Sequence, residues 1–292
     1  QFNQKFIDGI FSIADSLEKK TDGSLKGKIM ASLFYEPSTR TRFSFESAML
    51  RLGGSVITTE NAAEFSSAAK GETLEDSIRV VNNYADVIVL RHYEKGASEK
   101  ASLVSRVPVI NAGDGTGQHP TQALLDLYTI KKELGKIDGI TIALVGDLKH
   151  GRTIRSLAYL FGKYKGLKIY FVSPQALRVG NDIKNYLKRH KIDYEETEDL
   201  NSVIYKVDVL YQTRIQKERF KSEKEYKKFK GCYQIDGKLV RRMKAKSIIM
   251  HPLPRVGEIL PEVDNSPKAV YFKQARYGLF IRMALLKYIL KA

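Results

Sequence analysis

Tryptophan is absent from this 292-residue sequence, and cysteine occurs only once, at Cys232. A single cysteine excludes an intrachain disulfide and a cysteine-rich zinc site. The five histidines are scattered, without the H-E-x-x-H spacing of a helical zinc site, so we expect no metal. No apolar run reaches the length of a membrane span, and residues 1–20 resemble an amphipathic helix rather than a signal peptide. We therefore expect no membrane partner.

Acidic residues are few relative to basic ones. The chain has 49 Lys and Arg against 33 Asp and Glu, which gives a formal net charge of +16. Such a surplus raises the question of nucleic acid, but the basic residues are dispersed, and the densest stretch, 217–230, contains glutamates. No zinc-finger, RNA-recognition or basic-zipper pattern occurs. We expect small anionic ligands and no nucleic acid, with a non-catalytic basic binding protein as the alternative.

Strand-like and helix-like segments alternate along the chain, which is typical of parallel sheets covered by helices. We expect an α/β fold with two domains, each a parallel sheet flanked by helices, and an active site in the cleft between them. The expected first domain is 1–134 plus a C-terminal helix at about 277–292, and the second is 135–276. The expected strands are 28–35, 55–59, 87–91, 107–112, 140–146, 168–173, 193–196, 207–211 and 247–251, and the expected helices are 40–52, 74–84, 97–105, 120–134, 152–164, 181–190 and 200–205.

The turn after the first expected strand concentrates groups that bind anions, with Ser38, Thr39, Arg40 and Thr41 in succession. A helix is expected to begin there, and its first turn offers unpaired backbone N–H groups and a positive dipole end. Hydroxyl and guanidinium groups at such a place favour binding of a phosphate or carboxylate. Ligands also bind beyond the carboxyl ends of parallel strands. From this local pattern alone, a serine-capped helix with solvated arginines is an equal alternative.

Further motifs follow in a fixed order and cover nearly the whole chain. Together with Ser38–Arg42, they resemble the transcarbamylases, and within that family the aspartate transcarbamylase catalytic chain. Their number and order make the resemblance specific. The motifs are Lys70–Thr73 (KGET), Asn111–Asp114 (NAGD), His119–Gln122 (HPTQ), Val145–Leu148 (VGDL), Gly151–Thr153 (GRT), Thr213–Gln216 (TRIQ) and His251–Arg255 (HPLPR).

The resemblance implies a site that positions two substrates and stabilises charge, without a covalent intermediate. Ser66 and Lys70 match positions that reach in from a neighbouring subunit, so a monomer should be nearly inactive. Arg91, His119 and Thr41 match the groups that polarise the carbamoyl oxygen. The implied carbamoyl-phosphate-binding residues are Ser38, Thr39, Arg40, Thr41, Ser66, Lys70, Arg91, His119 and Gln122, of which Arg40, Thr41, Lys70, Arg91 and His119 are the implied catalytic residues.

The second domain bears on the choice between aspartate and ornithine. Ornithine transcarbamylases typically carry H-C-L-P and S-M-G motifs, whereas this chain has Pro252 at the position of that cysteine and no S-M-G. The Arg214 guanidinium would hold a carboxylate and repel an ammonium, so aspartate is favoured and ornithine is the alternative. Glu36, Arg152 and Arg219 match a set that bridges the domains on closure. The implied aspartate-binding residues are Lys70, Arg152, Thr153, Arg214, Gln216, Pro252 and Leu253.

The resemblance therefore implies carbamoyl transfer from carbamoyl phosphate to the amino group of L-aspartate. The products would be N-carbamoyl-L-aspartate and phosphate, in de novo pyrimidine biosynthesis. It implies no metal or organic cofactor, a cytoplasmic location, and a homotrimer whose active sites are shared between subunits. Separate regulatory chains stay open as partners.

Overall fold

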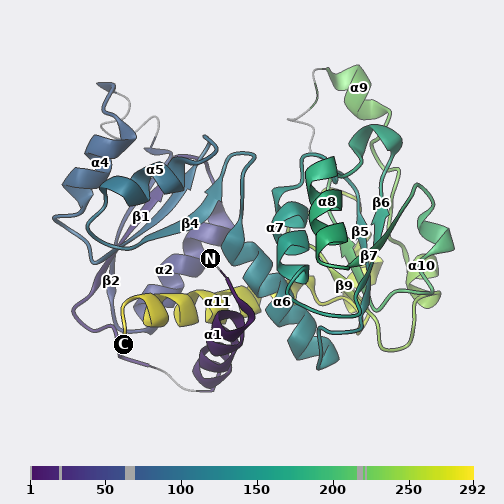
Figure 1. Ribbon diagram of the computed structural model, residues 1–292, viewed down its shortest axis with the longest axis horizontal. Helices are drawn as coiled ribbons and strands as arrows, with labels where there is room; N and C mark the ends of the chain where they lie inside the picture. The colour runs from purple at the N-terminus through teal and green to yellow at the C-terminus, as the bar shows by residue number, and fades with distance from the viewer. Residues whose placement is uncertain (1, 20–21, 63–69, 216–219, 221) are drawn as a thin grey trace. The chain divides into compact units, whose positions relative to one another are not determined.

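The computed structural model describes residues 2–19, 22–62, 70–215, 220 and 222–292. The chain divides into two compact units, the first Gln1–Leu125 with Arg276–Ala292 and the second Asp126–Ala275. Each unit contains one sheet whose paired strands all run parallel. The expected α/β class, with two parallel sheets flanked by helices, is confirmed (Figure 1). No helix in the described ranges is long and apolar enough to cross a bilayer.

The first unit contains a four-stranded sheet in the order β2-β1-β3-β4. Its elements, with the two helices that continue into the second unit, are α1 (Gln4–Leu17), β1 (Ile29–Phe34), α2 (Thr39–Arg51), β2 (Ser55–Glu60), α4 (Leu74–Val81), β3 (Val87–His92), α5 (Ala97–Val104), β4 (Val109–Asp114), α6 (Pro120–Leu134) and α11 (Tyr271–Ile289). Because side chains alternate along a strand, β1 serves both faces of the sheet. Ala31 and Leu33 join the core cluster that includes Ile78 of α4 and Ala101 of α5. The Ser32 hydroxyl instead donates to Glu46 of α2 at 3.1 Å.

The second unit contains a five-stranded sheet in the order β7-β6-β5-β8-β9. Its further elements are β5 (Thr141–Val145), α7 (Arg152–Phe161), β6 (Lys168–Val172), η2 (Gln175–Leu177), α8 (Asn181–Arg189), β7 (Asp193–Thr197), η3 (Leu200–Ser202), β8 (Val209–Gln212), α9 (Glu223–Lys227), α10 (Gly237–Arg241), β9 (Ile248–Met250) and η5 (Pro261–Asn265). One face of the sheet packs Ala143 and Val145 with Val240 of α10 and Val263 of η5. Each buried valine of this cluster contributes roughly 1.5–3 kcal/mol relative to an exposed one, which stabilises the central strands.

Two sequence predictions in this unit need correction. The helix predicted at 200–205 is a 3-10 turn at Leu200–Ser202, which the Asp199 carboxylate caps by accepting the Asn201 N–H at 2.8 Å and which ends where Val203 leaves helical geometry. The last helix begins at Tyr271 rather than near residue 277. Its early turn carries Gln274, a polar residue that is buried through hydrogen bonds to distant partners and so gives no apolar signal in the sequence.

Candidate active site

The sequence motifs cluster where strands end, as the fold class predicts. In the first unit, β1 leads into Ser38–Arg42, β3 carries Arg91 near its end, and β4 leads towards His119. The backbone holds two of these ends together, since the Tyr35 N–H donates to the Arg91 carbonyl at 2.8 Å. Parallel strands place their carboxyl ends along one edge, so these residues share an edge of the first sheet.

The first turn of α2 carries the residues that the sequence predicts to bind an anion. Ser38 is the N-cap, and its carbonyl accepts the Arg42 N–H at 3.0 Å, but its hydroxyl makes no capping hydrogen bond. The side-chain cap of the alternative interpretation is therefore not formed, although Arg40 is exposed as that interpretation expects. Thr41 is buried, whereas Thr39 and Arg40 are exposed. One apolar face anchors the helix in the core. Its residues Phe45, Ala48, Met49 and Leu52 are fully buried, as the periodicity predicted.

Arg91 is held rigidly although it is charged and only 7% exposed. Its Nη2 lies 2.9 Å from a Glu36 carboxylate oxygen, and its Nη1 donates to the Ala112 carbonyl at 3.2 Å. Paired partners of this kind are what allow a guanidinium to be buried. The ring of the next residue, His92, lies 4.8 Å from the Tyr35 ring in a tilted arrangement, and burial lowers the pKa of its imidazole. The sequence did not single out His92.

His119 and Gln122 are both buried at the start of α6, and the His119 carbonyl accepts the Gln122 N–H at 3.1 Å. The loop before them is organised by Asp114, whose carboxylate accepts the Gln118 N–H at 2.6 Å and the Gly96 N–H at 2.9 Å. Sequence analysis assigned no role to Asp114. A Gly-Asp pair at the end of a strand is the available signal, because aspartate side chains commonly hydrogen-bond turn backbones.

In the second unit, Arg152 and Thr153 directly follow the turn between β5 and α7. Both are half-buried, and Arg152 is the first residue of the helix. The turn is shaped by Asp147, which is fully buried and accepts the His150 backbone N–H at 3.0 Å. Gly146 has a φ of +116°, and a Cβ there would lie 2.4 Å from the Thr213 carbonyl oxygen, so the close approach requires glycine.

The ends of β8 and β9 provide the remaining predicted positions. Thr213 is tied to β5, since its N–H and hydroxyl both donate to the Val145 carbonyl, at 2.8 and 2.9 Å. Arg214 follows and is half-buried. After β9, Pro252 and Leu253 are half-buried in a loop.

Comparison with known proteins places this geometry in a family. The model of the aspartate/ornithine carbamoyltransferase carbamoyl-P binding domain matches residues 1–132, and that of the Asp/Orn binding domain matches residues 138–289. The chain belongs to the aspartate/ornithine carbamoyltransferase family. The chloroplastic aspartate carbamoyltransferase of Arabidopsis thaliana is 59% identical over 296 residues, covering 99% of this chain and 76% of the relative.

Solved structures of carbamoyltransferases also match nearly the whole chain. The catalytic subunit of Methanocaldococcus jannaschii aspartate transcarbamoylase superposes with a TM-score of 0.92 at 53% identity, covering 99% of this chain and 95% of that one. Trypanosoma cruzi aspartate transcarbamoylase, in complex with carbamoyl aspartate and phosphate, superposes with a TM-score of 0.92 at 43% identity, covering 98% and 92%. These matches agree with the two-domain α/β fold that the sequence of this carbamoyltransferase chain predicts.

Some predicted site residues are not placed. Ser66, Gln216 and Arg219 lie outside the described residues. Lys70 is described and exposed. Among the described residues, no group of three or more His, Cys, Asp or Glu side chains could hold a metal ion.

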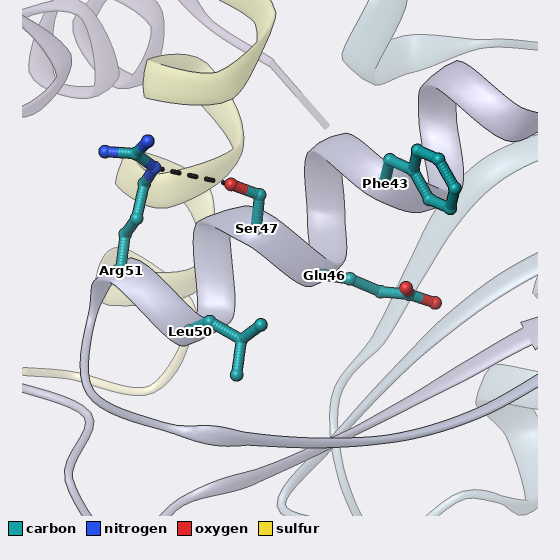
Figure 2. Close-up of a pocket in the computed structure, with 5 residues that line it drawn as sticks. All are labelled: Phe43, Glu46, Ser47, Leu50 and Arg51. Carbon is teal, nitrogen blue, oxygen red and sulfur yellow. Dashed lines mark hydrogen bonds between the residues drawn. The ribbon is translucent and has the colours of Figure 1, made fainter.

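A hollow of about 490 Å³ lies elsewhere, on the outer face of α2 (Figure 2). None of the predicted substrate-binding residues lines it. Two of its side chains are apolar and well exposed, Phe43 at 55% and Leu50 at 60%. The other lining residues are Glu46, Ser47 and Arg51.

Proposed function

We propose that this chain transfers the carbamoyl group of carbamoyl phosphate to the amino group of L-aspartate, giving N-carbamoyl-L-aspartate and phosphate in de novo pyrimidine biosynthesis. The observation that carries the assignment is the match to aspartate carbamoyltransferases over nearly the whole chain. Solved relatives are named in complex with carbamoyl phosphate, with aspartate and with N-(phosphonacetyl)-L-aspartic acid, which are ligands of that reaction.

The first unit binds carbamoyl phosphate. The backbone N–H groups of the first α2 turn and the side chains of Ser38, Thr39 and Arg40 hold the phosphate. Arg91 and His119, with Thr41, donate hydrogen bonds to the carbamoyl oxygen as negative charge develops on it. The burial of all three supports this role, because a charged hydrogen bond is stronger in a water-poor site. Gln122 contacts the carbamoyl amino group, and Ser66 and Lys70 complete the set.

The second unit binds L-aspartate. Arg152, Thr153 and Arg214, with Gln216 and Lys70, hold the two carboxylates, and an arginine fork matches a carboxylate in bidentate geometry. The position of Arg152 at the start of α7 supports this role, because the positive end of the helix dipole adds to its charge. Pro252 and Leu253 orient the attacking amine through their backbone carbonyls. Positioning of this kind supplies much of the rate enhancement without a covalent intermediate.

The functional assembly is a homotrimer, with Ser66 and Lys70 reaching the site of a neighbouring subunit. The exposed face of α2 supports self-association, because Phe43 and Leu50 expose large apolar side chains beside a hollow. Separate regulatory chains are a further candidate partner, because one relative, from Methanocaldococcus jannaschii, is named a catalytic subunit. The location is the cytoplasm, with a plastid as the alternative because plant relatives are named chloroplastic.

The test is product formation from carbamoyl phosphate with L-aspartate and L-ornithine offered separately. We expect carbamoyl aspartate only, and a loss of about 100-fold or more in kcat for Lys70→Ala because a cation that stabilises developing charge is removed. Lys100→Ala is the matched control, since Lys100 is a 58% exposed lysine of the same unit. Product formed from ornithine would contradict the proposed substrate. Full activity in a protein that sediments as a monomer would contradict an active site shared between subunits.

A further inference from the structure

A chain of hydrogen bonds crosses the interior of the second unit and ends at the loop after β9. The Tyr211 hydroxyl and the Gln274 amide both donate to the Asp126 carboxylate, each at 2.7 Å. The Gln274 side-chain carbonyl then accepts the His251 backbone N–H at 2.9 Å. All four residues are buried, although they come from β8, α6, α11 and the end of β9. The backbone is therefore fixed where the loop begins.

The His251 side chain extends this hydrogen-bond network into the loop. Its Nδ1 accepts the Leu253 backbone N–H at 2.7 Å, and its Nε2 lies 2.8 Å from a Glu258 carboxylate oxygen. Because Nδ1 faces a donor, the hydrogen-bond partners assign the ring proton to Nε2, which donates to Glu258. The other Glu258 oxygen accepts the Val256 N–H at 2.7 Å. The His251 imidazole and the Glu258 carboxylate thus each accept a backbone N–H of the loop, that of Leu253 and that of Val256.

The loop needs such support because its conformation is unusual. β9 ends at Met250, and none of the strand pairings within the described ranges includes residues 251–258. Leu253 has a φ of +53°, in the left-handed region that side chains other than glycine disfavour. The hydrogen bond to His251 satisfies its N–H in that conformation. Burial alone would raise the pKa of Glu258, but the hydrogen bonds from His251 and Val256 bring it below its ordinary value, so the group is a carboxylate at neutral pH.

We propose that His251, held by Glu258 and by the Asp126–Gln274 pair, is a positioning residue that sets the Pro252 and Leu253 carbonyls for the amine of aspartate. The proposal rests on the proposed function, which gives those two carbonyls their contact with aspartate. Under this proposal His251 does not contact the substrates, because it acts through the backbone of the loop. Its disturbance should change the use of aspartate and leave the binding of carbamoyl phosphate intact.

The test compares His251→Ala, His251→Asn and Glu258→Gln with the wild type. An asparagine oxygen can still accept the N–H two residues later, as in an Asx turn, but cannot reach Glu258. A glutamine can accept from His251 but opposes the Val256 N–H with its own NH₂ group. We expect the KM for L-aspartate to rise about 10- to 100-fold in His251→Ala, with a smaller rise in His251→Asn and Glu258→Gln. Protection against thermal unfolding by carbamoyl phosphate should stay unchanged.

The matched control is Asp208→Asn. Asp208 also joins a backbone N–H, that of Thr141 at 2.8 Å, to a side chain, that of Lys244 at 2.7 Å, but it lies before β8, at the amino ends of the strands. The Asp208→Asn variant should lose stability without a change in the KM for L-aspartate. If the loop variants lose only stability, as the control does, the positioning role is wrong. If His251→Ala does not fold, the same comparison is decided by Glu258→Gln. A wild-type protein that makes no carbamoyl aspartate would instead overturn the proposed function.

Discussion

Arg91 of the first unit is constrained at a different level from Arg152 and Arg214 of the second unit, although all three are proposed to bind substrate. In the first unit the side chain itself is fixed, since Arg91 is buried between the Glu36 carboxylate and the Ala112 carbonyl. In the second unit Arg152 and Arg214 are half-buried, and the surrounding hydrogen bonds constrain the backbone that carries them.

This difference indicates different contributions to the reaction. A side chain that is already held loses little rotamer freedom when the substrate binds, so its hydrogen bonds act fully on charge that develops in the transition state. Arg214 is instead proposed to bind a substrate carboxylate, whose charge is the same in the ground state and in the transition state, so its contribution is made to substrate binding. We therefore expect Arg91 to act mainly on kcat and Arg214 mainly on the KM for aspartate.

The largest effect is expected for Arg91→Ala. The substitution removes a donor to the carbamoyl oxygen and leaves the Glu36 carboxylate without its 2.9 Å cation, so kcat should fall about 100- to 1000-fold. Steady-state kinetics with both substrates varied measures this. Arg79→Ala is the control, because Arg79 is 60% exposed and pairs with Asp76 on the surface of α4. If Arg91→Ala changed only a substrate KM and left kcat intact, the expected difference between Arg91 and Arg214 would be wrong.

A smaller and more selective effect is expected for Arg214→Ala. The KM for L-aspartate should rise about tenfold or more, since a hydrogen bond to a charged group contributes roughly 1.5–3 kcal/mol. The kcat at saturating aspartate and the KM for carbamoyl phosphate should change little. Arg214→Lys should recover part of the loss, because it restores the charge without the fork. An equal rise in both KM values would show that the residue supports the fold rather than aspartate.

Local signals explain why the sequence predicted so much of the fold. α6 has the predicted bounds, Pro120–Leu134, because proline marks its first turn and Gly135 follows its last. The start of α11 was missed because Gln274 is buried by a bond to Asp126, 148 positions away. No periodic pattern reports a contact over such a distance.

The same limit applies to the candidate site. The sequence predicted roles for Arg91 and His119 through a family resemblance, but it did not predict the groups that hold such residues. Glu258 reads as an ordinary surface glutamate, and its importance depends on His251 and Val256 meeting it in the folded loop. Supporting residues of this kind carry no motif, because their partners are defined by the tertiary structure.

The smallest predicted effect concerns a carboxylate outside both sets of site residues and sets the baseline for the comparison. Asp22 pairs with Lys287 of α11, and the hydrogen bond from that lysine, with those from Ser24, lowers the pKa of Asp22 from 3.8 to about 2. The unfolded chain therefore binds more protons than the folded one between these values, so the pair stabilises the fold above pH 3.8 and loses its effect as the pH falls towards about 2.

Asp22→Asn keeps an acceptor for the Ser24 N–H but removes the charge, so its Tm at pH 6 should fall by at most about 2–4 °C. Thermal unfolding at several pH values between 6 and 3 should show the gap to wild type narrowing as the solution becomes more acidic. Lys287→Gln should behave in the same way, and the kcat and KM of both variants should equal those of the wild type. A gap that stays constant with pH would mean that the charge of Asp22 does not contribute, and that only contacts retained in both protonation states hold α11 to this part of the first unit.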